Sequence, residues 1–173
     1  MKNITPNNIY QTIPSTSLRK TAIKDPGSSI THFIGLIMAA IGTAPLLIRA
    51  GSHDNPFCMI SMVVFMTSMI LLYAASTVYH TFDISPSVNK VLKKVDHMMI
   101  SVLIAGSYTP VCLLVLNNRL GLLLLAIVWG LAITGILIKA FWIYCPKWFS
   151  SILYIGMGWT CILAFGPIVR SLT

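Results

Sequence analysis

The sequence predicts an all-α protein, a polytopic membrane helix bundle with five transmembrane helices. Of the 173 residues, 56% are hydrophobic and only 9% are charged, and the mean hydropathy is +0.82. Soluble domains average about 25% charged residues, so the composition excludes an ordinary soluble domain. The charged residues are also widely spaced, and they leave runs of 19 to 28 residues without a formal charge. About 20 apolar residues cross a bilayer as a helix, the form in which the backbone satisfies its own hydrogen bonds.

The chain divides into a polar tail and a membrane domain. Residues 1–24 contain no short apolar stretch followed by a cleavage site, so they are predicted to be a cytoplasmic tail rather than a secretory signal. Residues 25–173 are predicted to form one transmembrane domain without internal repeats. Its five spans are expected near Ser29–Ile48, Cys58–His80, His97–Leu116, Leu120–Ile138 and Trp148–Val169.

The basic residues predict how these spans are oriented. Nine of them fall in the tail, the second loop and the fourth connection, and three fall on the other side. Cytoplasmic loops carry such an excess, so the N-terminus is predicted to be cytoplasmic in a multi-pass protein of the cell membrane. Because these residues lie between apolar runs, we expect membrane lipids as partners and no nucleic acid. The nine are Lys2, Arg19, Lys20, Lys24, Lys90, Lys93, Lys94, Lys139 and Lys147, and the three are Arg49, Arg119 and Arg170.

Polar motifs stand at the ends of three apolar runs. They are T-H-x-x-G beginning at Thr31, S-x-x-x-H beginning at Ser76, and D-H beginning at Asp96. The predicted orientation brings all three to the cytoplasmic side, where the first three helices are expected to surround one pocket. Ser76 and His80 are four residues apart and share a helix face, with Tyr73 on the same stripe. Ionisable residues at such positions are costly, so they are candidates for a functional site.

These residue types are typical of a metal site. Zinc prefers imidazole or thiolate ligands, so the histidines of these motifs are candidate ligands. A carboxylate beside the metal can hold or deprotonate a bound water, and Asp96 is expected at a helix N-terminus, where the dipole favours its charged form. Structural roles stay open for each residue. His80 could reach the interface and Asp96 could cap its helix, while His32 and His97 could bridge helices or lie at the interface.

The ordered set of motifs resembles the hemolysin III family, the bacterial branch of the progestin and adipoQ receptor superfamily. The resemblance implies a bundle of seven helices with a cytoplasmic N-terminus, and a zinc site similar to that of alkaline ceramidases. The implied ligands are His80 and two histidines of an H-x-x-x-H motif on the last helix, with Asp96 and Ser76 near the metal and its water. The resemblance runs from about Lys24 to Thr173 and rests on Thr31–Gly35, Ser76–Phe82, Asp96-His97 and Leu103–Pro110.

The sequence departs from the family pattern in two places. Asp25 and Ser28 stand where the family's first motif has Glu and Asn. No H-x-x-x-H motif occurs, and the sequence ends after the fifth expected span. Two of the three implied zinc ligands are therefore expected to be absent, leaving a partial site in a chain that is C-terminally incomplete.

Three functions remain open from the sequence. The first is a zinc-dependent hydrolase of a lipid amide, with Asp96 as the base and Ser76 stabilising the developing oxyanion. The second is a hemolysin-like, pore-forming and cytolytic membrane protein, as the older label of bacterial family members implies. The third is a non-catalytic or truncated family member, which would be inactive as it stands.

Overall fold

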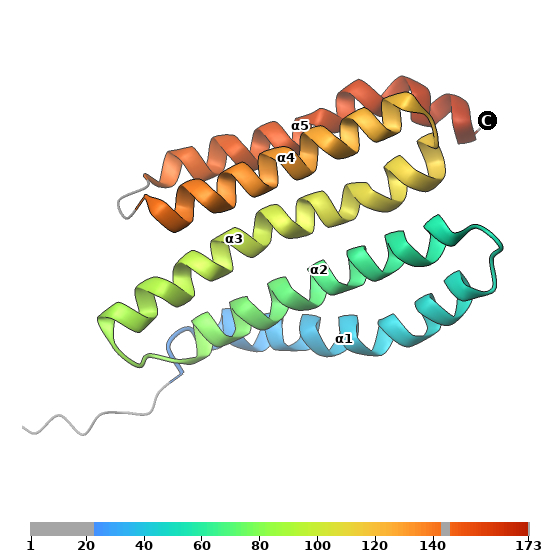
Figure 1. Cartoon of the computed structure of the whole chain (residues 1–173). Coiled ribbons are helices and arrows are strands. Elements are labelled where there is room, and N and C mark those ends of the chain that lie inside the picture. The colour runs from blue at the N-terminus through green and yellow to red at the C-terminus, as the bar shows by residue number, and fades with distance from the viewer. Residues whose placement is uncertain (1–22, 143–145, 173) are drawn as a thin grey trace, which may run out of the picture.

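The computed structural model describes residues 23–142 and 146–172, and this part of the chain is helical. Within these described residues, five segments are long and apolar enough to cross a membrane, which confirms the predicted all-α polytopic fold (Figure 1). Pro110, which lacks a backbone N–H, stands where α3 gives way to a short π-helix, η1. The helices are α1 (Pro26–Gly51), α2 (Pro56–Thr81), α3 (Pro86–Pro110), η1 (Val111–Leu116), α4 (Arg119–Phe141) and α5 (Lys147–Leu172).

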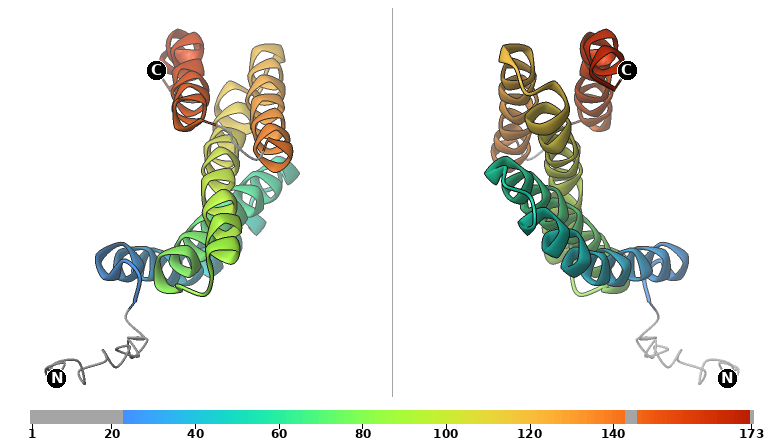
Figure 2. Two further views of the ribbon diagram at one scale, coloured as in Figure 1. Left: turned by 90° about the vertical axis from the view of Figure 1, so that its left-hand side faces the viewer. Right: turned by 90° about the vertical axis from the view of Figure 1, so that its right-hand side faces the viewer.

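The helices pack largely in the order of the chain. α1 packs against α2, α2 packs against α3, and α3, α4 and α5 contact one another. Among the described helices, α1 contacts α2 alone. The end-on views in Figure 2 show the result: α3, α4 and α5 form a compact group, while α2 and then α1 extend from it as a single layer.

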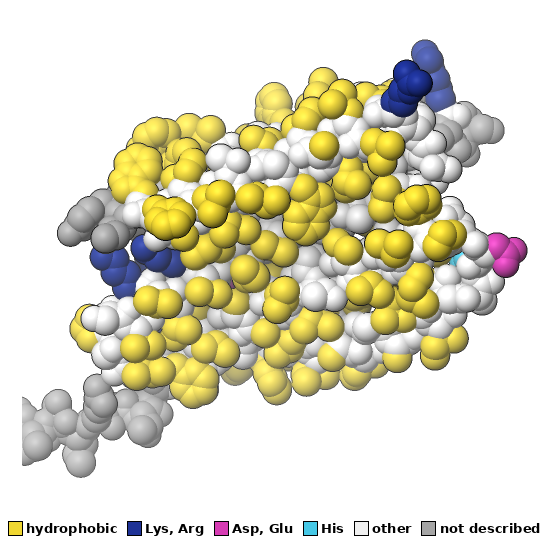
Figure 3. Space-filling view, in the orientation of Figure 1, with side chains coloured by type: hydrophobic (Ala, Val, Ile, Leu, Met, Phe, Trp, Pro, Cys, Tyr) yellow, Lys and Arg dark blue, Asp and Glu magenta, His cyan; other side chains and the backbone are white. Residues whose placement is uncertain are grey.

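Large apolar side chains cover the outer surface of the helices. On the face that Figure 3 shows, they cover the middle of the molecule, and the clusters of Lys, Arg and Asp side chains lie at its two ends. A soluble monomer rarely exposes apolar patches of this size, whereas lipid accepts them without cost. The multi-pass membrane location is therefore supported by the surface as well as by helix length. Side chains with more than 60% of their area exposed include Met38, Ile41, Ile48, Trp159, Ile162 and Phe165.

Polar caps fix where α2, α3 and α4 begin. The side chain of Asn55 accepts a hydrogen bond from the Phe57 N–H at 3.0 Å, and that of Asn118 accepts from the Gly121 N–H at 3.0 Å. Ser85 accepts from the Val88 N–H at 3.3 Å and caps α3. These contacts satisfy backbone donors that the first helical turn leaves without a partner.

The start of α3 corrects two expectations. α3 begins at Pro86, so Asp96 lies well inside the helix and neither caps it nor faces its N-terminal dipole. The helix continues beyond the apolar run because intrahelical hydrogen bonds form in water as well as in lipid. Lysines that were assigned to loops therefore lie on helices. They are Lys90, Lys93 and Lys94 on α3 and Lys139 on α4.

Small residues allow close contacts between the helices. A Cβ atom at Gly106 on α3 would overlap the side chain of Ser68 on α2. A Cβ atom at Gly35 on α1 would lie 2.7 Å from Cε1 of Tyr73 on α2. Glycine is thus required sterically at both positions, which is how membrane helices commonly approach one another. On the other side of α3, a core of Ala105, Val128, Ala132 and Met157 joins it to α4 and α5.

Candidate functional site

The polar motifs gather at one end of the molecule, called the lysine-rich end below. It is the end at which α1, α3 and α5 begin and α2 and α4 end (Figure 1). The basic residues described at this end are Lys24, Lys90, Lys93, Lys94, Lys139 and Lys147, whereas Arg49, Arg119 and Arg170 lie at the opposite end.

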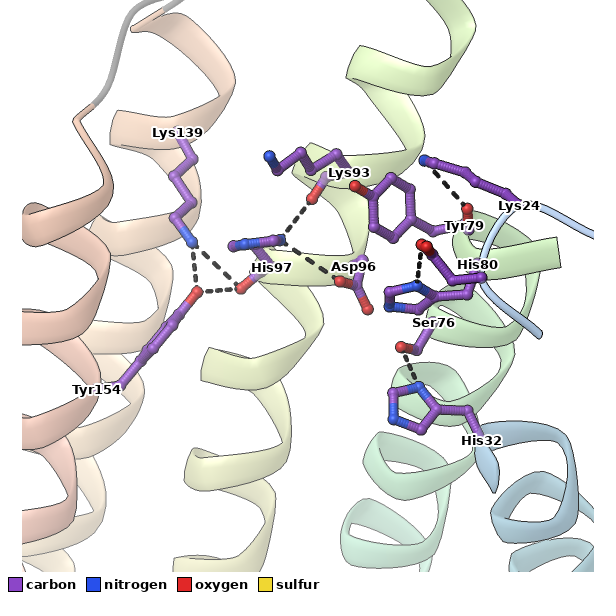
Figure 4. Close-up of polar contacts among 11 residues, drawn as sticks. Lys24, His32, Ser76, Tyr79, His80, Lys93, Asp96, His97, Lys139 and Tyr154 are labelled. Atoms are coloured by element: carbon purple, nitrogen blue, oxygen red, sulfur yellow. Dashed lines mark hydrogen bonds and ion pairs between the residues drawn. The ribbon is translucent and has the colours of Figure 1, made fainter. Parts of the chain in front are cut away.

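Two histidines and a serine meet between α1 and α2. Nδ1 of His32 and Oγ of Ser76 share a hydrogen bond, in which either group can donate. The rings of His32 and His80 lie edge to face with their centroids 5.5 Å apart, and the Tyr73 ring lies 6.1 Å from that of His32. Ser76 is buried, with 2% of its surface exposed. We call His32, Tyr73, Ser76 and His80 the histidine cluster; Figure 4 shows His32, Ser76 and His80.

Asp25 orients the second imidazole of this cluster. Nδ1–H of His80 donates to Oδ2 of Asp25 at 2.9 Å, and the Asp25 backbone N–H donates to the His80 carbonyl at 2.9 Å. The hydroxyls of Ser29 and Thr81, 2.6 Å apart, hold the same helix ends together. When Nδ1 of a neutral histidine carries the hydrogen, Nε2 carries the lone pair that can bind a metal.

Asp96 lies on the side of α3 that faces α2. It is buried, with 8% of its surface exposed, and its polar neighbours are His97, Ser76 and His80. The distance from its Oδ2 to Nδ1 of His97 is 3.4 Å. The structure thus brings a carboxylate close to the hydroxyl and one imidazole of the histidine cluster (Figure 4).

His97 points away from the histidine cluster, toward α4 and α5. Its Nδ1–H donates to the Lys93 carbonyl at 2.8 Å, and the Lys139 ammonium donates to the His97 carbonyl at 3.3 Å. Figure 4 shows His97 on the side of Lys139 and Tyr154, and Asp96 on the side of Ser76 and His80. Adjacent residues of α3 therefore serve two polar regions, which the contact between Asp96 and His97 connects.

Sequence reasoning missed three members of these regions. In the sequence, Asp25 stands out only as a departure from the family pattern, although an acid at the same end as His80 is consistent with the pairing that the structure shows. The charge pattern predicts a loop position for Lys139, but this residue is buried in α4 with 6% of its surface exposed. Nothing in the sequence pointed to Tyr154, whose hydroxyl contacts both the Lys139 ammonium and the His97 carbonyl.

The donor set does not by itself fit the zinc site that the family resemblance implies. Among the described residues, no group of three or more His, Cys, Asp or Glu side chains is placed to hold a metal ion. Catalytic zinc sites use three protein ligands and one open position. His80 and His32 supply two imidazoles, whose Nδ1 atoms are already bonded to Asp25 and Ser76. The described part of the chain therefore brings together two imidazoles, fewer than the three ligands that such a site needs.

Apolar helices that bury a polar cluster at one end define a polytopic helical membrane protein. The family model for haemolysin-III related proteins matches residues 20–173. The chain therefore belongs to the hemolysin III family.

Two relatives agree with this assignment. The chain is 38% identical to "Hemolysin-3" of Bacillus cereus over 158 residues, which are 91% of this chain and 72% of that protein. It is 37% identical to "Hemolysin-3 homolog" of Bacillus subtilis (strain 168) over 153 residues, which are 88% of this chain and 71% of that protein. No solved structure matches the chain significantly.

Proposed function

We propose that the histidine cluster is part of a zinc site and that the protein hydrolyses the amide of a membrane lipid. His80 would be a ligand and His32 a second one, and the remaining ligands would come from outside the described residues. The observation that carries this proposal is the pairing of each Nδ1 with a protein partner while the two rings stay 5.5 Å apart. Such pairing is how proteins orient imidazoles toward a metal.

The neighbouring side chains support hydrolysis as the reaction class. Asp96 is a buried carboxylate that can take up a proton, and Ser76 is a hydroxyl positioned by His32 that can donate to a developing oxyanion. The cluster lies near the helix ends, at the depth where the amide of a ceramide-like lipid joins its headgroup to its acyl chains. Substrate and site would therefore meet without the lipid leaving the bilayer.

Metal analysis of the purified full-length protein tests the zinc part. We expect zinc to be retained after dialysis, to be lost in His80→Ala, and to bind about 10–100-fold more weakly in Asp25→Asn, which removes the orienting carboxylate. His53→Ala is the matched control, because His53 lies in the loop at the opposite end. Wild-type protein without zinc would overturn the metal assignment.

A fluorescent ceramide-like substrate in the same preparation tests the reaction. Turnover is expected in the wild type, and Asp96→Asn is expected to lower kcat by about 10²–10⁴-fold, the range for a general base. Zinc binding without turnover would keep the metal site and reject the hydrolase.

A second candidate function, membrane lysis, is favoured by the names of both relatives. The exposed apolar faces of α1 and α5 would provide contacts between copies that assemble in a target bilayer. Dye-loaded liposomes are expected to leak more when the purified protein is added than they do without protein. Leakage that is equal with boiled protein would reject this function.

A further inference from the structure

A cavity of about 570 Å³ opens at the lysine-rich end between α3, α4 and α5. It is distinct from the histidine cluster, which lies between α1 and α2. Its volume falls within the range of small-molecule sites. The residues that give it its chemistry are Lys90, Lys93, Lys94, His97, Lys139 and Tyr154.

The lining of this cavity is strongly basic. Three lysines come from α3 and one from α4, and none of the lining residues is Asp or Glu. Lys90, Lys94 and His97 recur at helical spacing and so lie on one face of α3. The nearby carboxylate of Asp96 is not among the lining residues, although its Oδ2 lies 3.4 Å from Nδ1 of His97. Four ammonium groups around one cavity produce a positive potential that attracts anions.

Lys139 shows that this charge is built into the fold. Its side chain is buried inside a membrane-spanning helix, where an ammonium is expensive and by default marks a functional site. It donates to the His97 carbonyl at 3.3 Å and to the Tyr154 hydroxyl, and its Nζ lies 4.7 Å from the centroid of the Tyr154 ring. These contacts fix the ammonium in the cavity wall (Figure 4).

A topological role explains the exposed lysines but not the buried one. Positive charge that only orients a membrane protein can lie on the surface. Lys93 is exposed in this way. Burying Lys139 adds cost without improving orientation. The cavity also holds the hydroxyls of Ser150 and Ser151, which can donate to an anion.

We infer that this cavity binds a phosphate group, carried by an anionic phospholipid headgroup or present as free phosphate. Lysine ammonium groups are established phosphate binders, and basic pockets between transmembrane helices accept anionic headgroups. The cavity lies at the end of the helices, where headgroups reside. Trp142 lines it as well and is half exposed, as expected of an indole at the membrane interface.

Native mass spectrometry of the full-length protein in detergent tests this site with three probes: phosphatidylglycerol, phosphatidylcholine and inorganic phosphate. The wild type is expected to bind phosphatidylglycerol at least tenfold more tightly than phosphatidylcholine. The double variant Lys93→Gln/Lys94→Gln is expected to lose about tenfold to thirtyfold of this affinity, at about threefold to fivefold per lysine. Arg49→Gln/Arg119→Gln removes the same charge at the opposite end and is expected to leave binding unchanged.

The outcomes separate the two sources of phosphate. Inorganic phosphate that binds, competes with phosphatidylglycerol and depends on Lys93 and Lys94 would assign the site to free phosphate. If phosphatidylglycerol binds and inorganic phosphate does not compete with it, the site is assigned to a lipid headgroup. Equal binding of the two lipids with no binding of phosphate would overturn the proposal, as would an equal loss in the arginine variant.

Discussion

Replacing Gly106 with leucine is expected to prevent α2 and α3 from packing and to abolish the folded bundle. Even the Cβ of an alanine would overlap the Ser68 side chain, whose hydroxyl is held by a hydrogen bond to the Phe65 carbonyl at 2.7 Å. Overpacking of this kind costs on the order of 1–3 kcal/mol for a small group, and more for a leucine. Thermal unfolding in detergent, followed by circular dichroism, measures the loss.

Two further variants make this test specific. Gly42→Leu is the matched control, because no atom lies within 4 Å of a Cβ built at Gly42 on α1. Its melting temperature is expected to stay close to that of the wild type. The double variant Ser68→Gly/Gly106→Ala is expected to be more stable than Gly106→Ala alone, since the two positions share one contact. A Gly106→Leu protein that melts like the wild type would show that the two helices are not in close contact.

Replacing Lys139 with methionine is expected to separate stability from binding. Methionine removes the buried charge, and the Tyr154 hydroxyl can still donate to the His97 carbonyl, so both of these groups keep a partner. Replacing buried charges with apolar groups is often neutral or stabilising, so the melting temperature is expected to stay equal or to rise. Binding of phosphatidylglycerol is expected to fall by more than tenfold, because a buried charge is little screened by salt.

The same variant has a charge-preserving control. Lys139→Arg keeps the positive charge and is expected to retain most of the binding. A lower melting temperature for Lys139→Met, with binding unchanged, would make Lys139 a structural residue. The two readouts therefore distinguish a ligand-binding lysine from one that only holds α3, α4 and α5 together.

The sequence predicted the apolar segments well because hydropathy measures what lipid requires. Each of the five expected spans lies within one described helix, or within α3 and η1 together. Hydropathy does not show where a helix stops outside the lipid. The turns around Lys90 and Lys94 are polar but still helical, so the start of α3 was placed too late.

The candidate site was only partly predictable for a related reason. Motif positions indicated that His32, Ser76 and His80 share one end of the molecule. Their pairing depends on how α1 and α2 are rotated about their own axes, and packing at Gly35 against Tyr73 determines that rotation. The burial of Lys139 likewise depends on α5 packing beside it, which no pattern within α4 reveals.

In the part of the chain that the structure describes, α2 is the one helix that α1 packs against, and this has a consequence for biogenesis. Nearly all interhelical contacts join segments that are close in the chain, and short sequence separations favour fast, local assembly. The hairpin of α1 and α2 can associate as it leaves the translocon, while α4 and α5 are still on the ribosome. The hydrogen bond between His32 and Ser76 would then form early. α3 would add Asp96 later, to a pair of helices that is already in place.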